Sequence, residues 1–415
     1  MMDKKNIWII NQYAITPDMP GGTRHYNFAK ELVNRGYSAV IFASSFHHGL
    51  YKELKLDGTQ KYKIEKIDGV EFIWIKTNHY EKNDWRRVLN MVIFGWRSYW
   101  LARDLIKRGI IQKPDVIIGS SVHLLAVAAA YYLSLCYKAK FIMEVRDLWP
   151  KTLIDIGKFR KNNPIVKMLE ILEKYLYVRA KKIIVLFPFA KDYIVPMGIP
   201  EDKIVWISNG VSVSITEKEI RKTELDKLLK IVYIGSHGIA NNLMPIIEAA
   251  NLLQKKNFKN IKFIFVGNGP EKNKLIKRSH ELGLVNIEFR NPVQKKMVKN
   301  ILNEANAMII NLQNISLMKY GISLNKLYDC MASSRPVILG GDPINNLVKE
   351  SGCGMAVETG EAEDLANAII QLYRMAPRER EKMGERGRNY VQKHYSNSVL
   401  VDKLEKTINE VLNEK

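Results

Sequence analysis

Cysteine is scarce in this sequence: Cys136, Cys330 and Cys353 are the only three among 415 residues, and they stand far apart. No Cys-x-x-Cys pair or similar metal-ligand spacing accompanies them, which excludes a disulfide framework or a structural zinc site as the organising feature. Such cysteine usage fits a reducing, cytoplasmic compartment.

Long hydrophobic runs are also missing. The N-terminal apolar stretch, Ile7–Ile10, is too short for the core of a signal peptide. The longest apolar stretch, Leu124–Tyr137, is interrupted by Ser134 and falls short of the about 20 residues that cross a bilayer. We therefore expect no membrane-spanning segment.

Two signatures of cofactor use are absent. Gly21-Gly22 follows the first predicted strand, but it is not the G-x-G-x-x-G fingerprint, and the second strand ends in Ser44-Ser45 without an acidic ribose ligand. A nicotinamide-dependent enzyme is therefore disfavoured. The chain also has no Asp-x-Asp pair to hold Mg²⁺, so we predict that it needs no metal and no cofactor.

Acidic residues are outnumbered by basic ones. The 64 lysines and arginines against 43 aspartates and glutamates give a net charge of +21. Such an excess favours an anionic partner, which leaves nucleic acid, an anionic membrane surface or a phosphorylated substrate as candidates. A lysine-rich bias spread over the whole sequence would produce the same charge without any partner.

The composition is otherwise that of an ordinary globular protein, 47% hydrophobic and 26% charged, and the chain is long enough for two domains. Strand-like and helix-like segments alternate through the first half. Strands are expected at Asn6–Ile10, Ser38–Ala43, Val70–Lys76, Asp115–Gly119, Lys140–Val145 and Lys182–Phe187. This alternation predicts a parallel sheet with helices on both faces.

The alternation pauses at a polar, lysine-rich segment and then restarts. Strands are expected at Ile231–Ile234, Lys262–Val266, Asn286–Phe289, Ala307–Leu312 and Pro336–Leu339. We predict an α/β fold of two doubly wound halves, with a first domain over 1–211, a linker over 212–229, a second domain over 230–395 and a closing helix over 396–415. Ligands of open parallel sheets bind beyond the carboxyl ends of the strands, so the two sheets are expected to share a cleft.

Several motifs stand where such ligands bind. Gly21-Gly22 opens a helix and lets backbone N–H groups approach an anion, or it forms a simple turn. His123 follows the carboxyl end of a strand, where a structural and a functional role are equally open. Glu144, Arg146 and Asp147 end another strand, and charged groups there either form structural ion pairs or meet a ligand.

In the second half, Gly267-Asn268-Gly269-Pro270 lies between a strand and a helix, as a nucleotide contact or a tight turn. The most informative stretch is 320–332, in which a Gly/Ser loop runs into a helix with Lys326 and Asp329 one turn apart. Loop amides and a lysine suit a diphosphate, and a carboxylate suits ribose hydroxyls. An i,i+3 surface ion pair is the simpler alternative, but the glycine loop before it favours a binding site.

Aromatic residues and arginines mix in segment 84–109, which contains Trp85, Phe94, Trp96, Trp100, Arg86, Arg87, Arg97, Arg103 and Arg108. Together with lysines at 151, 158, 161, 167 and 174, it is expected to form a basic, aromatic face that lies on anionic lipid. Half of its apolar surface must in any case pack onto the sheet.

Taken in order, these motifs resemble those of glycosyltransferase family 4, the retaining nucleotide-sugar enzymes of GT-B fold. Within it they look closest to the bacterial O-antigen and capsule repeat-unit transferases of the fucosaminyltransferase-like group. The landmarks are Gly21-Gly22, Ser121-Val122-His123, Glu144–Pro150, Asn209-Gly210-Val211, Val266–Pro270 and the helix with Lys326 and Asp329. They span essentially the whole chain.

The resemblance implies two Rossmann-like domains facing a central cleft, with a nucleotide-sugar, most often UDP-linked, in the C-terminal one. The implied donor contacts are Gly22, Gly235, Gly267, Asn268, Val293, Gly321, Ile322, Ser323, Leu324, Lys326 and Asp329. Asp329 would meet the ribose, and the backbone around Asn291–Val293 the base. The implied catalytic residues are His123, near the transferred sugar, Lys326 and Asp147, and the implied acceptor contacts are Glu144, Arg146 and Asp147.

The chain departs from the family pattern at two places. The family's Glu-x7-Glu has Asp329 at its second position but Gly321 at its first, and Gly235-Ser236-His237-Gly238 stands where the family has an Arg and a Lys. Lys319 or Lys326 is therefore expected to neutralise the leaving diphosphate. A retaining route needs no strong protein base, whereas in an inverting route Asp147 would be the candidate base.

These features predict a transferase that moves an N-acetylhexosamine or deoxy-aminohexose from UDP to a polyprenyl-diphosphate-linked saccharide, at the cytoplasmic face of the inner membrane. A non-hydrolysing UDP-N-acetylglucosamine 2-epimerase of the same fold is one alternative, although few carboxylates are expected in its cleft. A basic nucleic-acid-binding protein is another, but no RNP, zinc-finger or helix-turn-helix pattern supports it, and we expect no nucleic-acid partner.

Overall fold

The computed structural model describes residues 4–82, 84–121, 123–155, 159–212 and 228–414. The chain forms two compact units. Unit 1 comprises Met1–Thr16, Gly22–Ser208 and Asn397–Lys415, and unit 2 comprises Pro17–Gly21 and Asn209–Ser396. Most of the expected linker, 213–227, lies outside the described residues, as do Val122 and Lys158.

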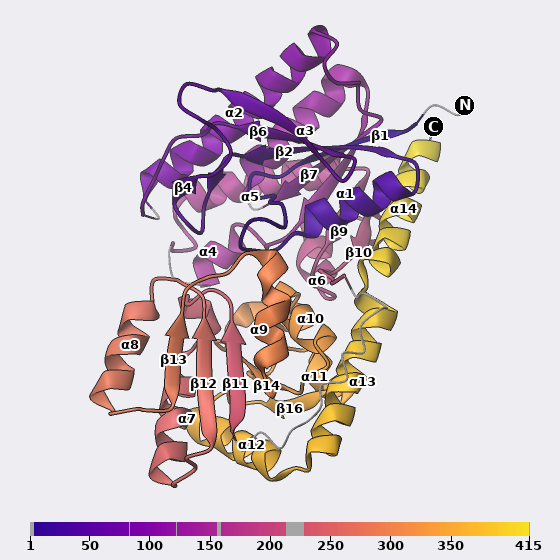
Figure 1. Ribbon diagram of the computed structural model, residues 1–415. Helices are drawn as coiled ribbons and strands as arrows, with labels where there is room; N and C mark the ends of the chain where they lie inside the picture. The colour runs from indigo at the N-terminus through magenta and orange to yellow at the C-terminus, as the bar shows by residue number, and fades with distance from the viewer. Residues whose placement is uncertain (1–3, 83, 122, 156–158, 213–227, 415) are drawn as a thin grey trace. The chain divides into compact units, whose positions relative to one another are not determined.

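Unit 1 is built on an eight-stranded sheet in the order β10-β9-β8-β7-β1-β2-β6-β5 (Figure 1). Its strands are β1 (Asn6–Ile10), β2 (Ser38–Ser44), β5 (Tyr62–Ile67), β6 (Val70–Ile75), β7 (Val116–Ser121), β8 (Lys140–Val145), β9 (Lys182–Val185) and β10 (Ile204–Trp206), while β3 (Phe46–His47) and β4 (Lys52–Glu53) form a separate hairpin. The central strands β1 and β7 are buried along their whole length, as expected of parallel strands covered on both faces.

One edge of this sheet differs from the prediction. Strand β5 was not expected, and it pairs antiparallel with β6, whereas the other neighbouring strands run parallel. The two strands are joined at Asp68-Gly69, whose φ angles of 48° and 82° are both positive. A two-residue turn of this kind matches the twist of an antiparallel pair and therefore closes a tight hairpin.

The helices of unit 1 are α1 (Arg24–Asn34), α2 (Trp85–Lys107), α3 (Leu124–Tyr137), α4 (Lys151–Asp155), α5 (Pro164–Arg179), α6 (Lys191–Ile194) and α14 (Asn397–Asn413), with short turns η1 (Val195–Met197) and η2 (Glu201–Lys203). Side chains fix where the long ones begin: Asp84 accepts a hydrogen bond from a backbone N–H at the start of α2, and Asn163 does the same for α5. The last helix, α14, packs against α1, and Arg35 pairs with Glu405 across them (2.8 Å).

Unit 2 contains a six-stranded parallel sheet in the order β13-β12-β11-β14-β15-β16. Its strands are β11 (Leu229–Ile234), β12 (Ile261–Val266), β13 (Ile287–Arg290), β14 (Ala307–Asn311), β15 (Val337–Gly340) and β16 (Gly354–Val357). Its helices are α7 (Met244–Lys255), α8 (Lys272–Glu281), α9 (Val298–Glu304), α10 (Asn325–Ala332), α11 (Leu347–Ser351), α12 (Ala362–Arg374) and α13 (Pro377–Tyr395), with short turns η3 (Ile239–Asn241), η4 (Lys295–Met297) and η5 (Ser316–Tyr320). Its core joins buried side chains of β11, β12, α7 and α12.

In both sheets the strand order reverses beside the first strand. Strand β1 lies between β2 and β7, and β11 lies between β12 and β14. Doubly wound sheets bind ligands outside the carboxyl ends of their strands at such a switch point. The predicted architecture of two α/β halves with parallel sheets is confirmed. We expect a site at the loops after β1, β7 and β8 in unit 1, and at the loops after β11 and β14 in unit 2.

Candidate functional site

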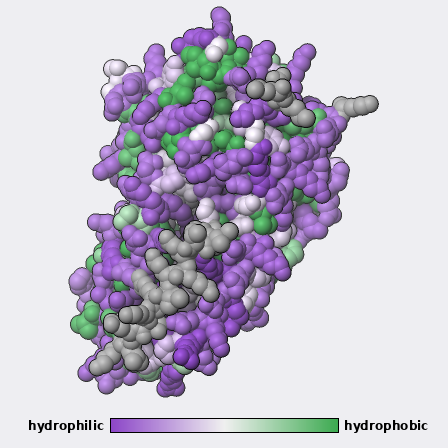
Figure 2. All heavy atoms as spheres, turned by 45° about the vertical axis from the view of Figure 1, so that its right-hand side comes forward, coloured by the Kyte–Doolittle hydropathy of each residue, from purple (hydrophilic) through white to green (hydrophobic). Residues whose placement is uncertain are grey.

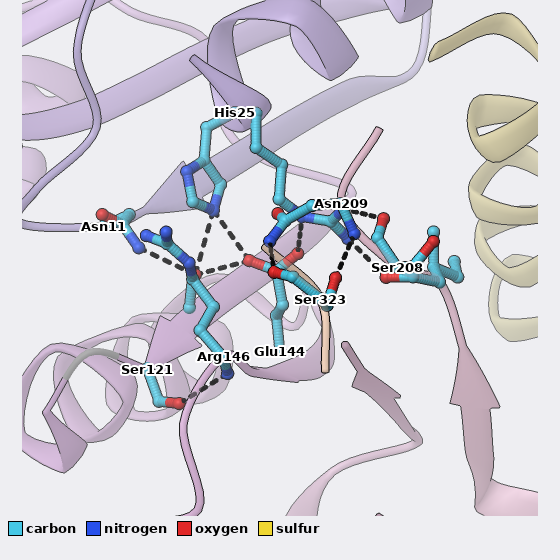
Figure 3. Close-up of polar contacts among 11 residues, drawn as sticks. Asn11, His25, Ser121, Glu144, Arg146, Ser208, Asn209 and Ser323 are labelled. Atoms are coloured by element: carbon cyan, nitrogen blue, oxygen red, sulfur yellow. Dashed lines mark hydrogen bonds and ion pairs between the residues drawn. The ribbon is translucent and has the colours of Figure 1, made fainter. Parts of the chain in front are cut away.

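The loop before α10 in unit 2 is held by side chains that bond its backbone (Figure 3 shows Asn209 and Ser323). Asn345 accepts a hydrogen bond from the N–H of Ile322 (2.7 Å) and donates one to its carbonyl (2.9 Å). Asn209 donates from its backbone N–H to Ser323 Oγ (2.8 Å) and from its amide to the Ser323 carbonyl (2.6 Å). Gly321 opens the loop with φ of 93°. These hydrogen bonds fix the backbone of the predicted loop directly before α10.

The N-terminus of α10 is open to an anion. Leu324 precedes the helix and caps it with no side-chain hydrogen bond, and the first turn carries no acidic residue. The first N–H groups of a helix lack intrahelical partners and carry a partial positive charge. A phosphate placed there accepts these N–H groups without displacing a competing carboxylate.

Lys326 lies in the first turn of α10 and adds a full positive charge. Its Nζ donates to the Tyr233 hydroxyl (3.2 Å) and to Asn241 Oδ1, and it lies 4.8 Å from the centre of the Tyr233 ring. Both partners are neutral, and no carboxylate pairs with this lysine in the described part of the chain. Burial lowers the pKa of Lys326 to about 8. A neighbouring anion would therefore satisfy a charge that the protein leaves uncompensated.

Asp329, one turn further along α10, has a partner that the sequence did not reveal. Its Oδ2 lies 2.5 Å from Nζ of Lys295, and the two side chains are 16% and 23% exposed. Lys295 begins η4, which follows the loop that contains Val293. Contacts of Asp329 with ribose and of Val293 with a base remain predictions. In a contact with ribose, the carboxylate of Asp329 would already be oriented by its ion pair with Lys295.

The glycines after β11 and β12 pack backbone against backbone. A Cβ added to Gly267 would lie 1.9 Å from the carbonyl oxygen of Gly235, and one added to Gly269 would lie 2.5 Å from that of His237. The N–H of His237 donates to the carbonyl of Asn268 (2.9 Å). The tight-turn interpretation of this motif therefore holds, and a nucleotide contact by Gly235, Gly267 or Asn268 remains a prediction.

In unit 1, His123 caps a helix. Its Nδ1 accepts the N–H of Ala126 at the start of α3 (3.2 Å), so Nε2 carries the proton and donates to Oε1 of Gln12. Gln12 in turn donates to Asn90 of α2. Burial and the charge of Arg87 lower the pKa of His123 to about 3, so the ring is neutral. Both ring nitrogens are occupied here, and a sugar contact by His123 remains a prediction.

Glu144 lies in a buried polar network at the end of β8 (Figure 3). Its Oε1 accepts from Arg24 Nε (2.9 Å), and its Oε2 accepts from His25 Nε2 (2.7 Å) and from the Ser120 hydroxyl. Asn11 completes the network by donating to Ser120 Oγ (2.8 Å). Of the two roles considered for Glu144, ion pairing is the one seen, because its carboxylate is only 5% exposed and fully occupied.

The pKa values in this network agree with an ionised carboxylate and a neutral histidine. Burial alone would raise the pKa of Glu144, but Arg24, His25 and Ser120 together hold it well below the usual range. Burial lowers the pKa of His25, against the opposing influence of Glu144. Arg24 also donates to the backbone carbonyls of Ile207 (2.9 Å) and Ser208, so it ties α1 and β8 to the chain after β10.

Arg146 and Asp147 follow Glu144 but have no such partners. The Arg146 side chain points toward Asn11 and His25 in Figure 3, and its Nε is buried without a hydrogen-bond partner. Its backbone N–H donates to Ser121 Oγ (3.2 Å). Burial raises the pKa of Asp147, and the positive charges of Arg146 and Arg87 oppose this rise. These two residues remain candidates for substrate contact.

Gly22 stands two residues before α1, half-buried, at a helix start that has no side-chain cap and no acidic residue in its first turn. The functional candidates that the sequence did not single out are Gln12, Arg24, His25, Asn90 and Lys295. Each is identified by a partner far away along the chain, and no local pattern marks it.

Among the described residues, no group of three or more His, Cys, Asp and Glu side chains is arranged to hold a metal ion. Metal independence stays a prediction. It would require the donor site to neutralise the leaving group with N–H groups and a lysine alone. Likewise, no described helix is long and apolar enough to cross a bilayer.

Two family models match successive parts of the chain. Residues 21–215 match the one described as Glycosyltransferase Family 4, and residues 215–390 match the one described as Glycosyl transferases group 1. A curated relative, the probable glycosyltransferase WbjE of Pseudomonas aeruginosa, is 20% identical over 319 residues, which are 73% of this chain and 76% of the relative.

Solved structures share the whole architecture. Sucrose-phosphate synthase from Thermosynechococcus elongatus matches with a TM-score of 0.74 and 14% identity, over 98% of this chain and 99% of that one. Anabaena Alr3699/HepE, solved in complex with UDP-glucose, matches with a TM-score of 0.66 and 12% identity, again over 98% and 99%. These likenesses confirm the predicted GT-B fold with two Rossmann-like domains.

Proposed function

The chain is a family 4 glycosyltransferase of GT-B fold, and we propose that it transfers a sugar from a UDP-sugar to a polyprenyl-diphosphate-linked saccharide with retention of configuration. The donor sugar we propose is an N-acetylhexosamine or deoxy-aminohexose, and the pathway is the synthesis of a bacterial surface polysaccharide such as O-antigen or capsule. The fucosaminyltransferase-like group remains the proposed subgroup.

One observation carries the proposal: an uncapped helix N-terminus and an uncompensated lysine stand together at the switch point of unit 2. The first N–H groups of α10 and the Nζ of Lys326 offer several donors to one diphosphate. Structures with this fold have been solved with UDP, UDP-glucose or a UDP-sugar analogue, which supports a UDP-linked donor here.

The chemistry follows from where charge develops. Breaking the bond between the sugar C1 and the phosphate oxygen leaves negative charge on the diphosphate, and N–H groups and a lysine stabilise that charge best when water is excluded. The acceptor hydroxyl then bonds to C1 on the same face, and its proton passes to the departing phosphate oxygen. In this route Lys326 stabilises the leaving group, and no metal is required.

The residues in unit 1 take supporting roles in this proposal. Asp147, whose carboxyl has no bonded partner among the described residues, orients the acceptor hydroxyl, and in an inverting enzyme it would be the base. His123 follows the carboxyl end of β7, and through its hydrogen bonds to Gln12 and to the start of α3 it orients the residues that we place near the transferred sugar. Glu144 supports the acceptor site through its buried network.

A lipid-linked acceptor is supported by an exposed apolar surface in unit 1. Thirteen of the twenty large hydrophobic side chains that are exposed in the described residues lie on α2, α3 and α5. They are Trp85, Val88, Leu89, Val92, Trp96, Trp100, Tyr132, Leu135, Ile165, Met168, Ile171, Tyr175 and Val178. We call this set the apolar face; Figure 2 shows hydrophobic side chains at the surface of unit 1 among hydrophilic ones. Monomeric proteins rarely expose so continuous a set without a partner.

The spacing of these side chains places apolar residues on the solvent side of α2 as well as on its buried side. On α2 the exposed apolar positions recur every three or four residues, on the side opposite buried Phe94. A groove of about 250 Å³ runs between α2 and α3, lined by Val92, Gly95, Trp96, Tyr99, Leu125, Ala129 and Tyr132. Arg103 and Arg179 flank the apolar face and stack on its aromatic rings. Aromatic, apolar and cationic groups in one face suit the headgroup region of an anionic membrane.

The comparisons do not favour the alternatives. Neither a 2-epimerase nor a nucleic-acid-binding protein is among the matching families described above. A diphosphate donor, a diphosphate acceptor and an anionic membrane surface are the anionic partners that we propose for the net charge of +21.

Titration of the purified protein with UDP, GDP, ADP, CMP and TDP, with and without EDTA, tests the donor assignment. We expect UDP to raise the melting temperature in both conditions, because a ligand that binds only the folded state stabilises it. The shift should disappear in Lys326→Met and persist in Lys274→Met, an exposed lysine on α8. Release of UDP from UDP-N-acetylhexosamines in the presence of lipid-linked acceptor then tests transfer. A protein that responds to no nucleotide would contradict the proposal.

A further inference from the structure

Two arginines from different elements of unit 1 converge on one place at the carboxyl edge of its sheet. Arg146 follows β8, and Arg87 lies in the first turn of α2. The charges of both act on the carboxyl of Asp147, which therefore lies near each of them. Arg146 also acts on His25, Arg87 on His123, and both act on His48, so both cations lie among the residues at the carboxyl ends of β1, β7 and β8.

Arg146 is the less satisfied of the two. Its guanidinium forms no ion pair with any described residue, and its Nε is buried without a hydrogen-bond partner. Glu144, two residues earlier in the chain, is already occupied by Arg24 and His25. A half-buried guanidinium with a free N–H group is costly unless it binds an acceptor of hydrogen bonds.

Arg87 faces inward although its neighbour faces outward. Arg86 is exposed, whereas Arg87 is half-buried on the side of α2 that carries buried Asn90. The same helix presents Trp85 and Val88 to solvent as part of the apolar face. One turn of α2 therefore offers apolar groups outward and a cation inward, which suits a ligand that has a hydrocarbon part and an anionic part.

From this arrangement we propose that Arg87 and Arg146 form a subsite for a diphosphate group, and that the lipid-linked acceptor supplies it. The proposal rests on the proposed function and deepens its acceptor assignment. Two guanidinium groups outnumber the single carboxylate of Asp147, and guanidinium forks match phosphate oxygens in pairs. With the diphosphate held there, the saccharide attached to it extends toward Asp147, which is free to accept a hydrogen bond from a sugar hydroxyl.

The chain offers a matched pair of variants for the test, Arg87→Gln and its neighbour Arg86→Gln, which remove the same charge one residue apart. Arg146→Gln and Arg146→Lys complete the set. The lysine keeps the positive charge but lacks the paired N–H groups of the guanidinium. Each protein is saturated with UDP and titrated calorimetrically with geranyl diphosphate, a soluble isoprenoid diphosphate, and the affinity for UDP is measured separately. Melting temperatures verify that each variant is folded.

We expect Arg87→Gln and Arg146→Gln each to weaken geranyl diphosphate binding at least about tenfold, Arg146→Lys to weaken it less, and Arg86→Gln to change it less than about twofold. UDP binding should stay within about twofold throughout. If UDP weakens instead, the subsite holds the nucleotide and the acceptor assignment is overturned. If geranyl diphosphate does not bind, or binds all variants equally, the subsite itself is refuted. Failure of the proposed function appears separately, as absence of UDP binding.

Discussion

Arg24 and Glu144 form an ion pair from which water is excluded: Nε lies 2.9 Å from Oε1, and the two side chains are only 2% and 5% exposed. They are 120 residues apart and join the start of α1 to the end of β8. Removing one partner of such a pair leaves the other charge buried and unpaired, which usually costs about 3–5 kcal/mol.

We therefore expect Glu144→Gln to lower the free energy of unfolding by about 3 kcal/mol. Glu31→Gln, which breaks the more exposed pair with Arg35, should cost less than about 1 kcal/mol. Urea titration of both variants measures the difference. Because the folded-state pKa of Glu144 is depressed, its contribution is present above the unfolded-state pKa of about 4.3 and is lost as the pH falls below it. Glu144→Gln should lack this acid-dependent loss.

The affinity for UDP should depend on pH through Lys326. Its pKa of about 8 means that it loses its charge as the pH rises from 7 to 9, and a neutral amine holds a diphosphate less well. We expect UDP binding to weaken over this interval in the wild type and to be weaker but nearly flat in Lys326→Met. Calorimetric titrations at four pH values would show it; a wild-type profile as flat as that of the variant would exclude Lys326 as the diphosphate ligand.

Glu173 on α5 predicts a second pH effect, this time on stability. Its carboxyl is buried and hydrogen-bonded by Tyr177 (2.8 Å) and Tyr193 (3.0 Å), and burial raises its pKa to about 8. The folded state therefore keeps a proton that the unfolded state releases near pH 4.3, so stability falls as the pH rises toward 8, by up to about 1.4 kcal/mol per pH unit. Glu173→Gln should remove this decline. Thermal unfolding between pH 5 and pH 8 compares the two slopes.

The apolar face predicts binding to anionic vesicles. Trp96 on α2 is 63% exposed, and Trp96→Asp places a charge within the apolar face, so vesicle binding should weaken at least about tenfold. Val285→Asp is the control, because Val285 is an exposed apolar residue (90%) that belongs to unit 2 and lies outside the apolar face. Co-sedimentation with phosphatidylglycerol vesicles gives the measurement, and added salt should reduce the wild-type binding. Equal binding by both variants would show that the apolar face does not contact lipid.

Close backbone packing in unit 2 predicts that two glycines respond differently to the same change. A Cβ at Gly269 would lie 2.5 Å from the His237 carbonyl oxygen, whereas one at Gly238 would meet nothing closer than the Ser236 hydroxyl at 3.4 Å. Gly269→Ala should therefore lower stability by about 1–3 kcal/mol, and Gly238→Ala should be nearly neutral. Urea unfolding decides this, and a Gly269→Ala protein as stable as the wild type would mean that this turn adjusts at no cost.

Much of the fold could be predicted because buried parallel strands leave continuous apolar runs. Ile7–Ile10 and Val116–Ile118 are buried on both faces and read as strands without ambiguity. Strand β5 was missed because it lies at the sheet edge, where Lys63, Glu65 and Lys66 make it look like a polar loop. The Asp68-Gly69 pair after it is a strong hairpin signal that would have located it.

The site could be predicted only in part. The loop before α10 and its lysine are close in sequence, so their pattern was visible, and Arg146 and Asp147 are marked by charge at the end of an apolar strand. The pairing of Glu144 with Arg24, and of Asp329 with Lys295, joins positions that only the folded sheet brings together. The same holds for the contact of His123 with Gln12, which lies 111 residues away along the chain, whereas its capping of α3 is local.

Helix α14 comes last in the sequence but belongs to unit 1, although α13 before it belongs to unit 2. Its Leu400, Leu404 and Ile408 are almost completely buried, so a protein truncated after Ser208 would lose this cover and expose apolar surface. In gene terms, most of unit 2 is an insertion into unit 1, not a tail appended to it. Exchanging this unit, in which we propose that the donor binds, therefore calls for two crossover points, one near residue 209 and one near residue 396, with α14 retained from the recipient.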